Sequence, residues 1–402
     1  MTQLLTALSM SSLTAAEVWQ AQALRREKAL RVLMVTPRYF PYQGGVESHV
    51  HEVARRLARQ DVEITVLTTQ PHGQWPAEET REGVKIRRVK AWPAERDYYF
   101  APKIRSVIRE GTWDVIHVQS YHTLVAPLAM WTAWRAHIPY IVTFHGGGHS
   151  SQLRKALRGT QWAALRPLLA RASRLITVAQ FEQEFWGTRL KLPADRFVFI
   201  PNGADLPAPE PAAHEAVRPH TRIASIGRLE HYKGHHRLLA ALPHILAQRP
   251  DVKLWMAGVG PYEADLRQLA RLLEVEDHVE IRAVPATERS RMAAELMQTD
   301  LVVLLSEYET HPVAVLEALA LQRPVLVAAT SGLQELADKG WARSIPLNST
   351  PQQVAAAVLD QLDHPLIPPQ LALPTWDECA GQLRELYDEV AQHAPRRVAT
   401  AA

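Results

Sequence analysis

Two cationic side chains, Arg228 and Lys233, share one short stretch between Gly227 and Gly234, directly after the β-branched run 222–226. Arginine offers a planar fork of donors that fits phosphate oxygens, and lysine adds a mobile point charge. Together the two could neutralise a departing diphosphate. The spacing therefore predicts a strand-to-helix loop that binds a phosphate ester.

Two carboxylates, Glu309 and Glu317, stand eight positions apart, shortly after the apolar run 301–305. We expect Glu309 in a loop at a helix start and Glu317 about two turns later on the same side. Carboxylates accept hydrogen bonds from vicinal hydroxyls, so one suits a sugar ring and the other a ribose. Because Glu317 interrupts an apolar run, we expect it to be buried and to need a partner.

A glycine pair, Gly44 and Gly45, follows the β-branched run 31–36 and leads into a helix that we expect to open near Val46. Glycines at a helix start let a phosphate approach the main-chain N–H groups, where the helix dipole also favours negative charge. The alternative is a glycine loop that only turns the chain. The phosphate interpretation depends on the other two motifs lying nearby.

Short β-branched runs and longer amphipathic stretches alternate on both sides of the Pro/Ala-rich segment 206–219. This alternation predicts βαβ units and a parallel sheet in each half. We therefore expect an α/β protein with two Rossmann-like, doubly wound domains, 30–205 and 220–372, joined by a linker at 206–219 and preceded by an extension at 1–29. Ligands bind at the carboxyl ends of such strands, so the site would lie in a cleft between the domains. The expected elements are 31–36, 48–59, 63–68, 115–118, 140–144 and 174–178, then 222–226, 235–246, 253–257, 262–273, 279–282, 301–305, 312–320 and 324–327.

The composition indicates an ordinary globular protein of 402 residues, with 47% hydrophobic and 22% charged content and a net charge of +3. A single cysteine, Cys379, excludes an internal disulfide and fits a reducing compartment. The longest uncharged apolar stretches, such as 125–134, are shorter than the roughly 20 residues of a membrane-spanning helix. We expect a cytoplasmic protein.

The charge is unevenly distributed, because no Asp or Glu occurs between Asp114 and Glu182. Within this stretch, segment 153–174 alternates leucines with basic residues, as in a partly amphipathic helix. One interpretation is a solvated basic surface. The other is a surface that contacts either the anionic inner face of a membrane or a phosphorylated acceptor. Nucleic acid is not an expected partner, since the basic residues form no recognised module.

Several motifs in a fixed order resemble glycosyltransferase family 4, which has the GT-B fold. The resemblance extends from Arg31 to Val390. The stretch after Trp376 is similar to the family's last helix, which crosses back to the first domain. We expect this crossover helix at 373–395. The motifs are Gly44-Gly45-Val46-Glu47, Phe144-His145-Gly146, Ile200-Pro201-Asn202-Gly203-Ala204-Asp205, Gly227-Arg228-Leu229 with Lys233-Gly234, Gly258-Val259-Gly260-Pro261, and the Glu309 and Glu317 pair.

The resemblance implies an acceptor domain at 30–205, a donor domain at 220–372 and a role for each matching residue. The main-chain N–H of Gly45, beside Gly44, would bind the diphosphate together with Arg228 and Lys233. Glu317 would bind the ribose. Glu309 would bind the donor sugar, and His145 would lie beside the reacting sugar. The implied catalytic set is His145, Glu309, Arg228 and Lys233.

The remaining implied donor contacts surround the base and the acidic motif. Main-chain groups of Arg282 and Val284 would contact the base, with Gly258 and Gly260 leaving room for it. His311 and Val313 complete the donor site. The chain departs from the family pattern at His311 and Pro312, where the family often has Phe-Gly, and at Gln322, where it usually has glycine.

The family mechanism implies transfer of a hexose-type sugar, with retention, from a UDP- or GDP-sugar to a glycan, lipid-linked or small-molecule acceptor. The leaving phosphate oxygen would accept the acceptor's proton, so no enzyme nucleophile is required. The sequence has no Asp-x-Asp motif. We therefore expect no metal or other cofactor, because cationic side chains and helix ends take the metal's role.

Other functions remain open on the same kind of fold. A nucleotide-sugar epimerase or a phosphorylase would share the phosphate site, and a non-catalytic nucleotide-sugar-binding or scaffold protein would keep the fold without the reaction. An NAD-dependent dehydrogenase is disfavoured, because Pro261 follows Gly258-Val259-Gly260 where the dinucleotide fingerprint would continue.

Overall fold

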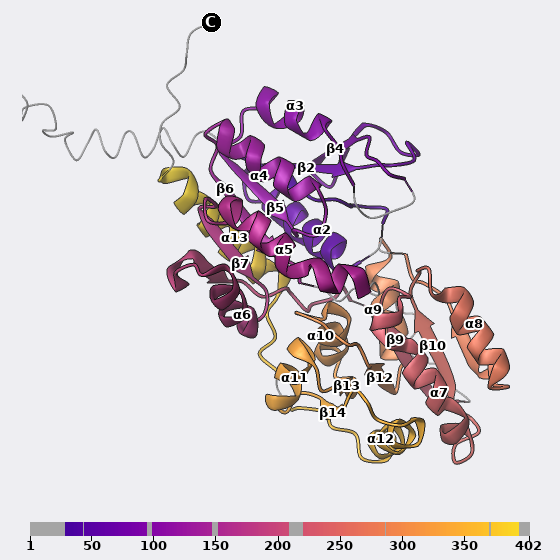
Figure 1. The fold of residues 1–402 in the computed structure, drawn as a ribbon. Coiled ribbons are helices and arrows are strands. Elements are labelled where there is room, and N and C mark those ends of the chain that lie inside the picture. The colour runs from indigo at the N-terminus through magenta and orange to yellow at the C-terminus, as the bar shows by residue number, and fades with distance from the viewer. Residues whose placement is uncertain are drawn as a thin grey trace, which may run out of the picture.

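The computed structural model describes residues 29–42, 44–94, 99–146, 152–208, 220–285, 287–369 and 371–393, without the side chains of 152–158. It contains two parallel-sheet α/β domains, one on each side of residues 200–208 (Figure 1). The predicted fold class is therefore confirmed. Most of the expected extension and of the expected linker, 1–28 and 209–219, lies outside the described residues.

The first sheet has the strand order β3–β4–β2–β1–β5–β6–β7–β8, and only the pair β3–β4 is antiparallel. Its strands are β1 (Leu30–Val35), β2 (Val62–Thr69), β3 (Glu78–Arg81), β4 (Val84–Val89), β5 (Val115–Gln119), β6 (Tyr140–Phe144), β7 (Arg174–Thr177) and β8 (Phe197–Phe199). Every residue of β5 and β6 is buried, as in central strands covered on both faces.

Helices cover both faces of this sheet, and alternate residues of β1 face the two cores. Leu33 and Val35 lie in one core, and Val32 and Met34 lie in the other. The first core is closed by α3 (Lys103–Glu110), α4 (Val125–Arg135), α5 (Gln152–Leu169) and α6 (Gln180–Leu190). The second is closed by α2 (Gly45–Leu57) and α13 (Trp376–Gln392).

The second sheet is parallel throughout, with the order β11–β10–β9–β12–β13–β14. Its strands are β9 (Arg222–Ile226), β10 (Lys253–Ala257), β11 (Val279–Ile281), β12 (Leu301–Leu304), β13 (Val325–Ala328) and β14 (Arg343–Ile345). One face carries α7 (His235–Leu246), α8 (Glu263–Leu272) and α12 (Pro351–Asp363), and the other α9 (Arg289–Met297), α10 (Val313–Ala320) and α11 (Ser331–Asp338). Short 3₁₀ turns lie at Ala194–Arg196, His231–Lys233 and Glu276–His278.

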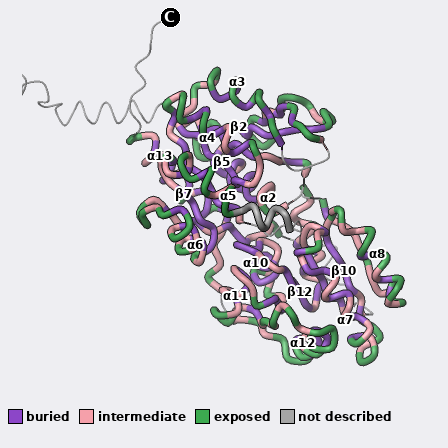
Figure 2. Tube along the Cα trace, in the orientation of Figure 1, coloured by how far each residue is buried: buried purple, intermediate pink, exposed green. Residues whose placement is uncertain are grey.

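Buried residues follow the strands of both sheets, whereas the outer faces of helices such as α8 and α12 are exposed (Figure 2). None of the described helices is long and apolar enough to cross a membrane. The strand order reverses between β1 and β5 in the first sheet and between β9 and β12 in the second. In doubly wound sheets ligands bind at the carboxyl ends of strands at these positions.

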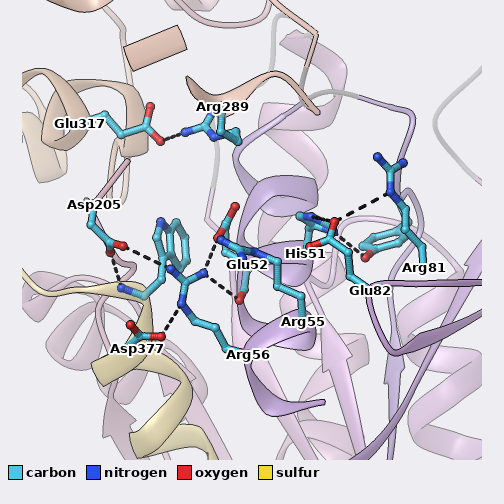
Figure 3. Close-up of polar contacts among 12 residues, drawn as sticks. His51, Glu52, Arg55, Arg56, Arg81, Glu82, Asp205, Arg289, Glu317 and Asp377 are labelled. Atoms are coloured by element: carbon cyan, nitrogen blue, oxygen red, sulfur yellow. Dashed lines mark hydrogen bonds and ion pairs between the residues drawn. The ribbon is translucent and has the colours of Figure 1, made fainter. Parts of the chain in front are cut away.

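The C-terminal helix α13 returns to the first domain, as expected. Its Tyr387 hydroxyl lies 2.6 Å from Nδ1 of His117 on β5. A second link is Arg56 on α2, whose Nε donates to Asp377 Oδ1 at 2.7 Å and whose Nη2 donates to Asp205 Oδ2 at 3.2 Å (Figure 3). Asp205 also accepts a hydrogen bond from the main-chain N–H of Trp376 at 2.5 Å. The two segments that connect the domains, at Asp205 and at the start of α13, are thus both hydrogen-bonded to Arg56 of α2.

Candidate active site

A cleft of about 370 Å³ lies between the two domains, at the carboxyl ends of their central strands. The first domain contributes the segments that follow β1, β5 and β6. The second contributes the segments that follow β9, β10 and β12, together with α9 and α10. The cleft therefore lies where both strand orders reverse.

Most of the residues predicted from the sequence line this cleft, and two do not. Gly260 and Arg282 are the exceptions. The lining residues are Gly44, Gly45, His145, Arg228, Lys233, Gly258, Val284, Glu309, His311, Val313 and Glu317.

Arg282 faces away from the cleft, because two carboxylates hold its guanidinium. Its Nε donates to Glu280 Oε1 and its Nη2 to Glu295 Oε1, both at 2.7 Å. Its carbonyl oxygen accepts a hydrogen bond from Nε1 of Trp255 at 3.0 Å, so the main chain is also engaged. The expected base contact at Arg282 has no support in this geometry.

Gly260 is required for loop packing rather than for space around a ligand. A Cβ at Gly260 would lie 2.3 Å from the carbonyl oxygen of Leu229, and one at Gly258 would lie 1.9 Å from that of Gly227. The two glycines thus let the loops after β9 and β10 touch. Of the two, Gly258 also lines the cleft.

Lys233 and Glu309 form an ion pair inside the cleft, with Nζ 2.6 Å from Oε1. Burial acts to lower the pKa of Lys233, but the Glu309 carboxylate outweighs it and the pKa is raised. Glu309 Oε1 also accepts from the Ser306 hydroxyl at 2.8 Å, and the Glu309 N–H donates to the Ser331 hydroxyl at 2.8 Å. The ammonium is therefore charged and held in one place.

Arg228 lies in the same cleft and keeps its charge. Its Nη1 lies 2.7 Å from Glu230 Oε1, and its Nη2 donates to the Tyr232 hydroxyl at 3.1 Å. Burial acts to lower its pKa, but Tyr232, Glu230 and, from helix α2 of the first domain, Glu47 raise it above its ordinary value. Glu47 lines the same cleft from the first domain, so this guanidinium shares the cleft with a carboxylate of the other domain.

Helix α2 begins at Gly45, at the wall opposite these cations, and no side chain caps its start. A Cβ at Gly45 would meet no atom within 4 Å, so the space beside its α-carbon is not filled by the described residues. The first N–H groups of a helix have no partner within it and attract anions. An anion in the cleft can therefore lie between main-chain donors of one domain and Arg228 and Lys233 of the other.

His145 follows β6 and is buried beside a second histidine. Its Nε2 lies 2.7 Å from Gln119 Oε1, and its ring centroid lies 4.8 Å from that of His49. Burial lowers the pKa of His145 well below its ordinary value, so the imidazole is neutral at pH 7. His49 Nδ1 lies 2.8 Å from Asn202 Oδ1, and Asn202 Nδ2 donates to the His311 carbonyl at 3.5 Å. This chain of contacts joins the two domains beside the cleft.

Glu317 is only 3% exposed and pairs with Arg289 at the start of α9 (Figure 3). Burial raises the pKa of its carboxyl group, and Arg289 opposes that effect. The sequence predicted that Glu317 would need a partner but did not identify Arg289, which also lines the cleft. The only sequence signal was a basic residue at the start of a helix of the same domain.

Glu182 on α6 is a second residue that the sequence reasoning missed. It is buried, and its Oε2 accepts from the main-chain N–H groups of Val178 and Ala179 at 3.0 and 3.3 Å. Burial raises the pKa of Glu182 to about 7. Its Oε1 lies 3.0 Å from where a Cβ on Gly146 would be, so it borders the cleft wall. No helix was predicted after the run 174–178, so nothing in the sequence singled out Glu182.

The basic segment 153–174 forms most of α5 and the turn that follows it. The side chains of 153–158 lie outside the described residues. Further along, Arg166 Nε donates to the Leu190 carbonyl at 2.6 Å, and the Arg171 guanidinium lies 4.9 Å from the ring centroid of half-exposed Trp134. These two arginines bind neighbouring parts of the protein while remaining near its surface.

Comparison with known proteins gives matches along nearly the whole described chain. Residues 43–207 match the model of Glycosyltransferase Family 4, and residues 210–370 match that of Glycosyl transferases group 1. Glycogen synthase of Mycobacterium tuberculosis is 30% identical over 376 residues, which cover 84% of this chain and 87% of that protein. D-inositol 3-phosphate glycosyltransferase of Thermobispora bispora is 26% identical, covering 94% of this chain and 98% of that protein.

Solved structures share the fold at low sequence identity. Sucrose-phosphate synthase from Thermosynechococcus elongatus superposes with a TM-score of 0.73 at 19% identity, covering 90% of this chain and 99% of that one. HepE of Anabaena, solved with UDP and glucose, superposes with a TM-score of 0.67 at 18% identity, covering 90% of this chain and 97% of that one. Since the models match both halves and the matching motifs meet in one cleft, the chain is a glycosyltransferase that belongs to family 4, with the GT-B fold.

Proposed function

We propose that this protein transfers a hexose-type sugar, with retention, from a UDP- or GDP-sugar to a glycan, lipid-linked or small-molecule acceptor. One observation carries the proposal: the open start of α2 at Gly45 faces Arg228 and Lys233 across a single cleft. Three sources of positive potential thus surround the space that a pyrophosphate would fill. Losing one such contact to a departing anion costs on the order of 3 kcal/mol in the transition state.

The remaining groups receive roles by their position around that space. Glu309 would accept hydrogen bonds from the donor sugar, Glu317 from the ribose, and neutral His145 would lie beside the sugar on the acceptor side. Lys233 and the Ser306 hydroxyl already engage Glu309, which makes its carboxylate a weak nucleophile. This supports a reaction in which the leaving phosphate oxygen takes the acceptor's proton and no enzyme nucleophile is needed.

We propose further that the reaction requires no metal ion. The charges of Arg228 and Lys233 supply the stabilisation that a divalent cation provides elsewhere. Activity that persists in excess EDTA would support this, and activity restored only by a divalent cation would contradict it.

The acceptor and the cellular location are proposed from the surface of the first domain. The basic segment 153–174 would hold the cytoplasmic protein against the anionic inner face of a membrane that carries the acceptor. We expect salt-sensitive cosedimentation with vesicles that contain anionic lipid. Equal sedimentation with purely zwitterionic vesicles, or none at low salt, would contradict this part of the proposal.

A thermal-shift screen of nucleotide sugars tests the central proposal. A ligand at 100 times its dissociation constant stabilises the folded protein by about 2.7 kcal/mol. Lys233→Ala should abolish the shift from the best donor, whereas Lys85→Ala, at an exposed site in the first domain, should keep it. Turnover with an acceptor should then give a product of unchanged anomeric configuration, measured by NMR.

The outcomes also separate the rival functions. A sugar altered while still attached to its nucleotide would indicate an epimerase, and sugar transfer to inorganic phosphate a phosphorylase. Binding without turnover in a broad acceptor panel would indicate a scaffold. No shift with any nucleotide sugar would refute the proposal.

A further inference from the structure

Two arginines bracket the segment between β11 and α9, and each is held by a carboxylate. At one end Arg282 pairs with Glu295, and at the other Arg289 pairs with Glu317. Between them, Ala283 and Val284 line the cleft. Both ends of this cleft-lining segment are therefore fixed by charge-assisted hydrogen bonds, which are stronger and more directional than neutral ones.

The first of these pairs belongs to an anchor for helix α9. Glu295, on α9, also accepts from Arg222 Nη1 on β9 at 2.7 Å, and the Arg222 guanidinium lies 4.5 Å from the ring centroid of Trp255. This network lies on the side of Arg282 that faces away from the cleft. It fixes α9 to the sheet, so the guanidinium of Arg289 projects from a rigid element.

The second pair controls a carboxylate that would be unfavourable alone. Glu317 is buried, and two further acids, Glu52 and Asp205, act with burial to raise its pKa. Arg289 Nη2 donates to its Oε1, and Figure 3 shows the other carboxylate oxygen pointing away from Arg289. One oxygen is thus engaged by the cation, and the other remains available to a ligand in the cleft that Glu317 lines.

We propose that Arg289 is a positioning residue for donor binding: its ion pair holds one oxygen of Glu317 and orients the second oxygen to accept a hydrogen bond from the ribose of a nucleoside diphosphate. The proposal rests on the proposed function, because it needs a nucleotide in this cleft. It adds that the cleft-lining residues Ala283 and Val284 and the ribose-binding carboxylate are held by the same pair of arginines. A change at Arg289 therefore affects the nucleoside part of the donor and leaves the pyrophosphate part unaffected.

Calorimetric titration with UDP, GDP and inorganic pyrophosphate tests this division. Arg289→Gln should weaken binding of the preferred nucleoside diphosphate by roughly 10- to 100-fold, the range for a hydrogen bond to a charged group. Affinity for pyrophosphate should stay within about twofold. Arg291→Gln is the matched control, because Arg291 lies on the same helix and pairs only at the surface with Glu288. It should change neither affinity.

A pH series separates positioning from simple structural damage. Donor binding that needs ionised Glu317 is lost as pH falls through its pKa, and removing the opposing Arg289 raises that pKa further. The acid limb of nucleoside diphosphate binding should therefore move to higher pH in Arg289→Gln. In the Glu317→Gln background the limb should be absent, and adding Arg289→Gln should cost little more.

Three results would overturn the inference while leaving the proposed function intact. They are an unchanged nucleoside diphosphate affinity in Arg289→Gln, an equal loss of pyrophosphate affinity, and an acid limb that does not move. If Arg289→Gln does not fold, Arg289→Lys decides: it keeps the charge, so the acid limb should stay in place while affinity falls less, and any shift of the limb would refute the inference. By contrast, failure of the wild-type protein to bind either nucleotide or pyrophosphate would refute the proposed function itself.

Discussion

The buried carboxyl group of Glu182 should make the stability of the first domain depend on pH in a direction opposite to that of most acidic residues. Its pKa is raised to about 7 in the folded protein, because burial disfavours the charged form. The folded state therefore binds more protons than the unfolded state between pH 4.5 and 7. Stability contributed by this group is present below that range and is lost as pH rises through it.

The size of this effect on stability follows from the size of the shift in the pKa of Glu182. A pKa raised from 4.5 to about 7 corresponds to about 3 kcal/mol of unfolding free energy. Glu182→Gln keeps an oxygen for the N–H groups of Val178 and Ala179 but cannot ionise. The difference in unfolding free energy between Glu182→Gln and wild type should therefore shift by about 3 kcal/mol in favour of the variant as pH rises from 4.5 to 8.

Urea unfolding followed by circular dichroism at several pH values measures this difference directly. Buried histidines titrate in both proteins and cancel in the comparison. The control is Glu184→Gln, which lies on the same helix but is exposed, so its difference from wild type should stay constant with pH. A constant difference for Glu182→Gln as well would show that its carboxyl group does not titrate abnormally, and the reasoning would fail.

Three further substitutions test the parts that hold the cleft together, each by urea unfolding. Arg56→Ala should cost roughly 2–3 kcal/mol, because it removes a buried guanidinium that hydrogen-bonds to Glu52, Asp205 and Asp377. Arg267→Ala at an exposed helical pair should cost less than about 1 kcal/mol. Gly234→Ala should cost at least about 2 kcal/mol, since φ is +75° and a Cβ would lie 1.9 Å from the Leu305 carbonyl oxygen. Trp376→Ala should cost roughly 3–5 kcal/mol through the cavity it leaves in the core of the first domain. Losses below 1 kcal/mol at Arg56, Gly234 or Trp376 would contradict the packing described.

Much of the fold was predictable because its sheets are parallel and buried. The runs 140–144, 222–226 and 253–257 coincide with β6, β9 and β10, since continuous β-branched and apolar residues between helical stretches have few other interpretations. Strand β3, Glu78–Arg81, gave no such signal. All four of its residues are exposed, and it is defined only by antiparallel pairing with β4.

The cleft was predictable to the extent that its residues follow strands at the reversals of strand order. Lys233 and Glu309 belong to loops after β9 and β12, which are neighbours, so topology brings them within 2.6 Å. Arg282 also follows a strand, but its direction depends on Glu280 and on Glu295, which lies thirteen positions away. Sequence spacing does not show with which of two nearby carboxylate groups a long cationic side chain will pair. For the same reason the pairing of Arg289 with Glu317 was not predicted.

Helix α13 has a consequence for the order in which the protein is made. Trp376, Leu383 and Tyr387, near the end of the chain, complete a core whose other members include Val32 and Val50, near its beginning. A ribosome must therefore release the chain at least through Tyr387 before the first domain can close its core, whereas the second domain lies wholly before residue 376. A released chain that ends at residue 375 should therefore leave the first domain sensitive to proteases while the second resists them.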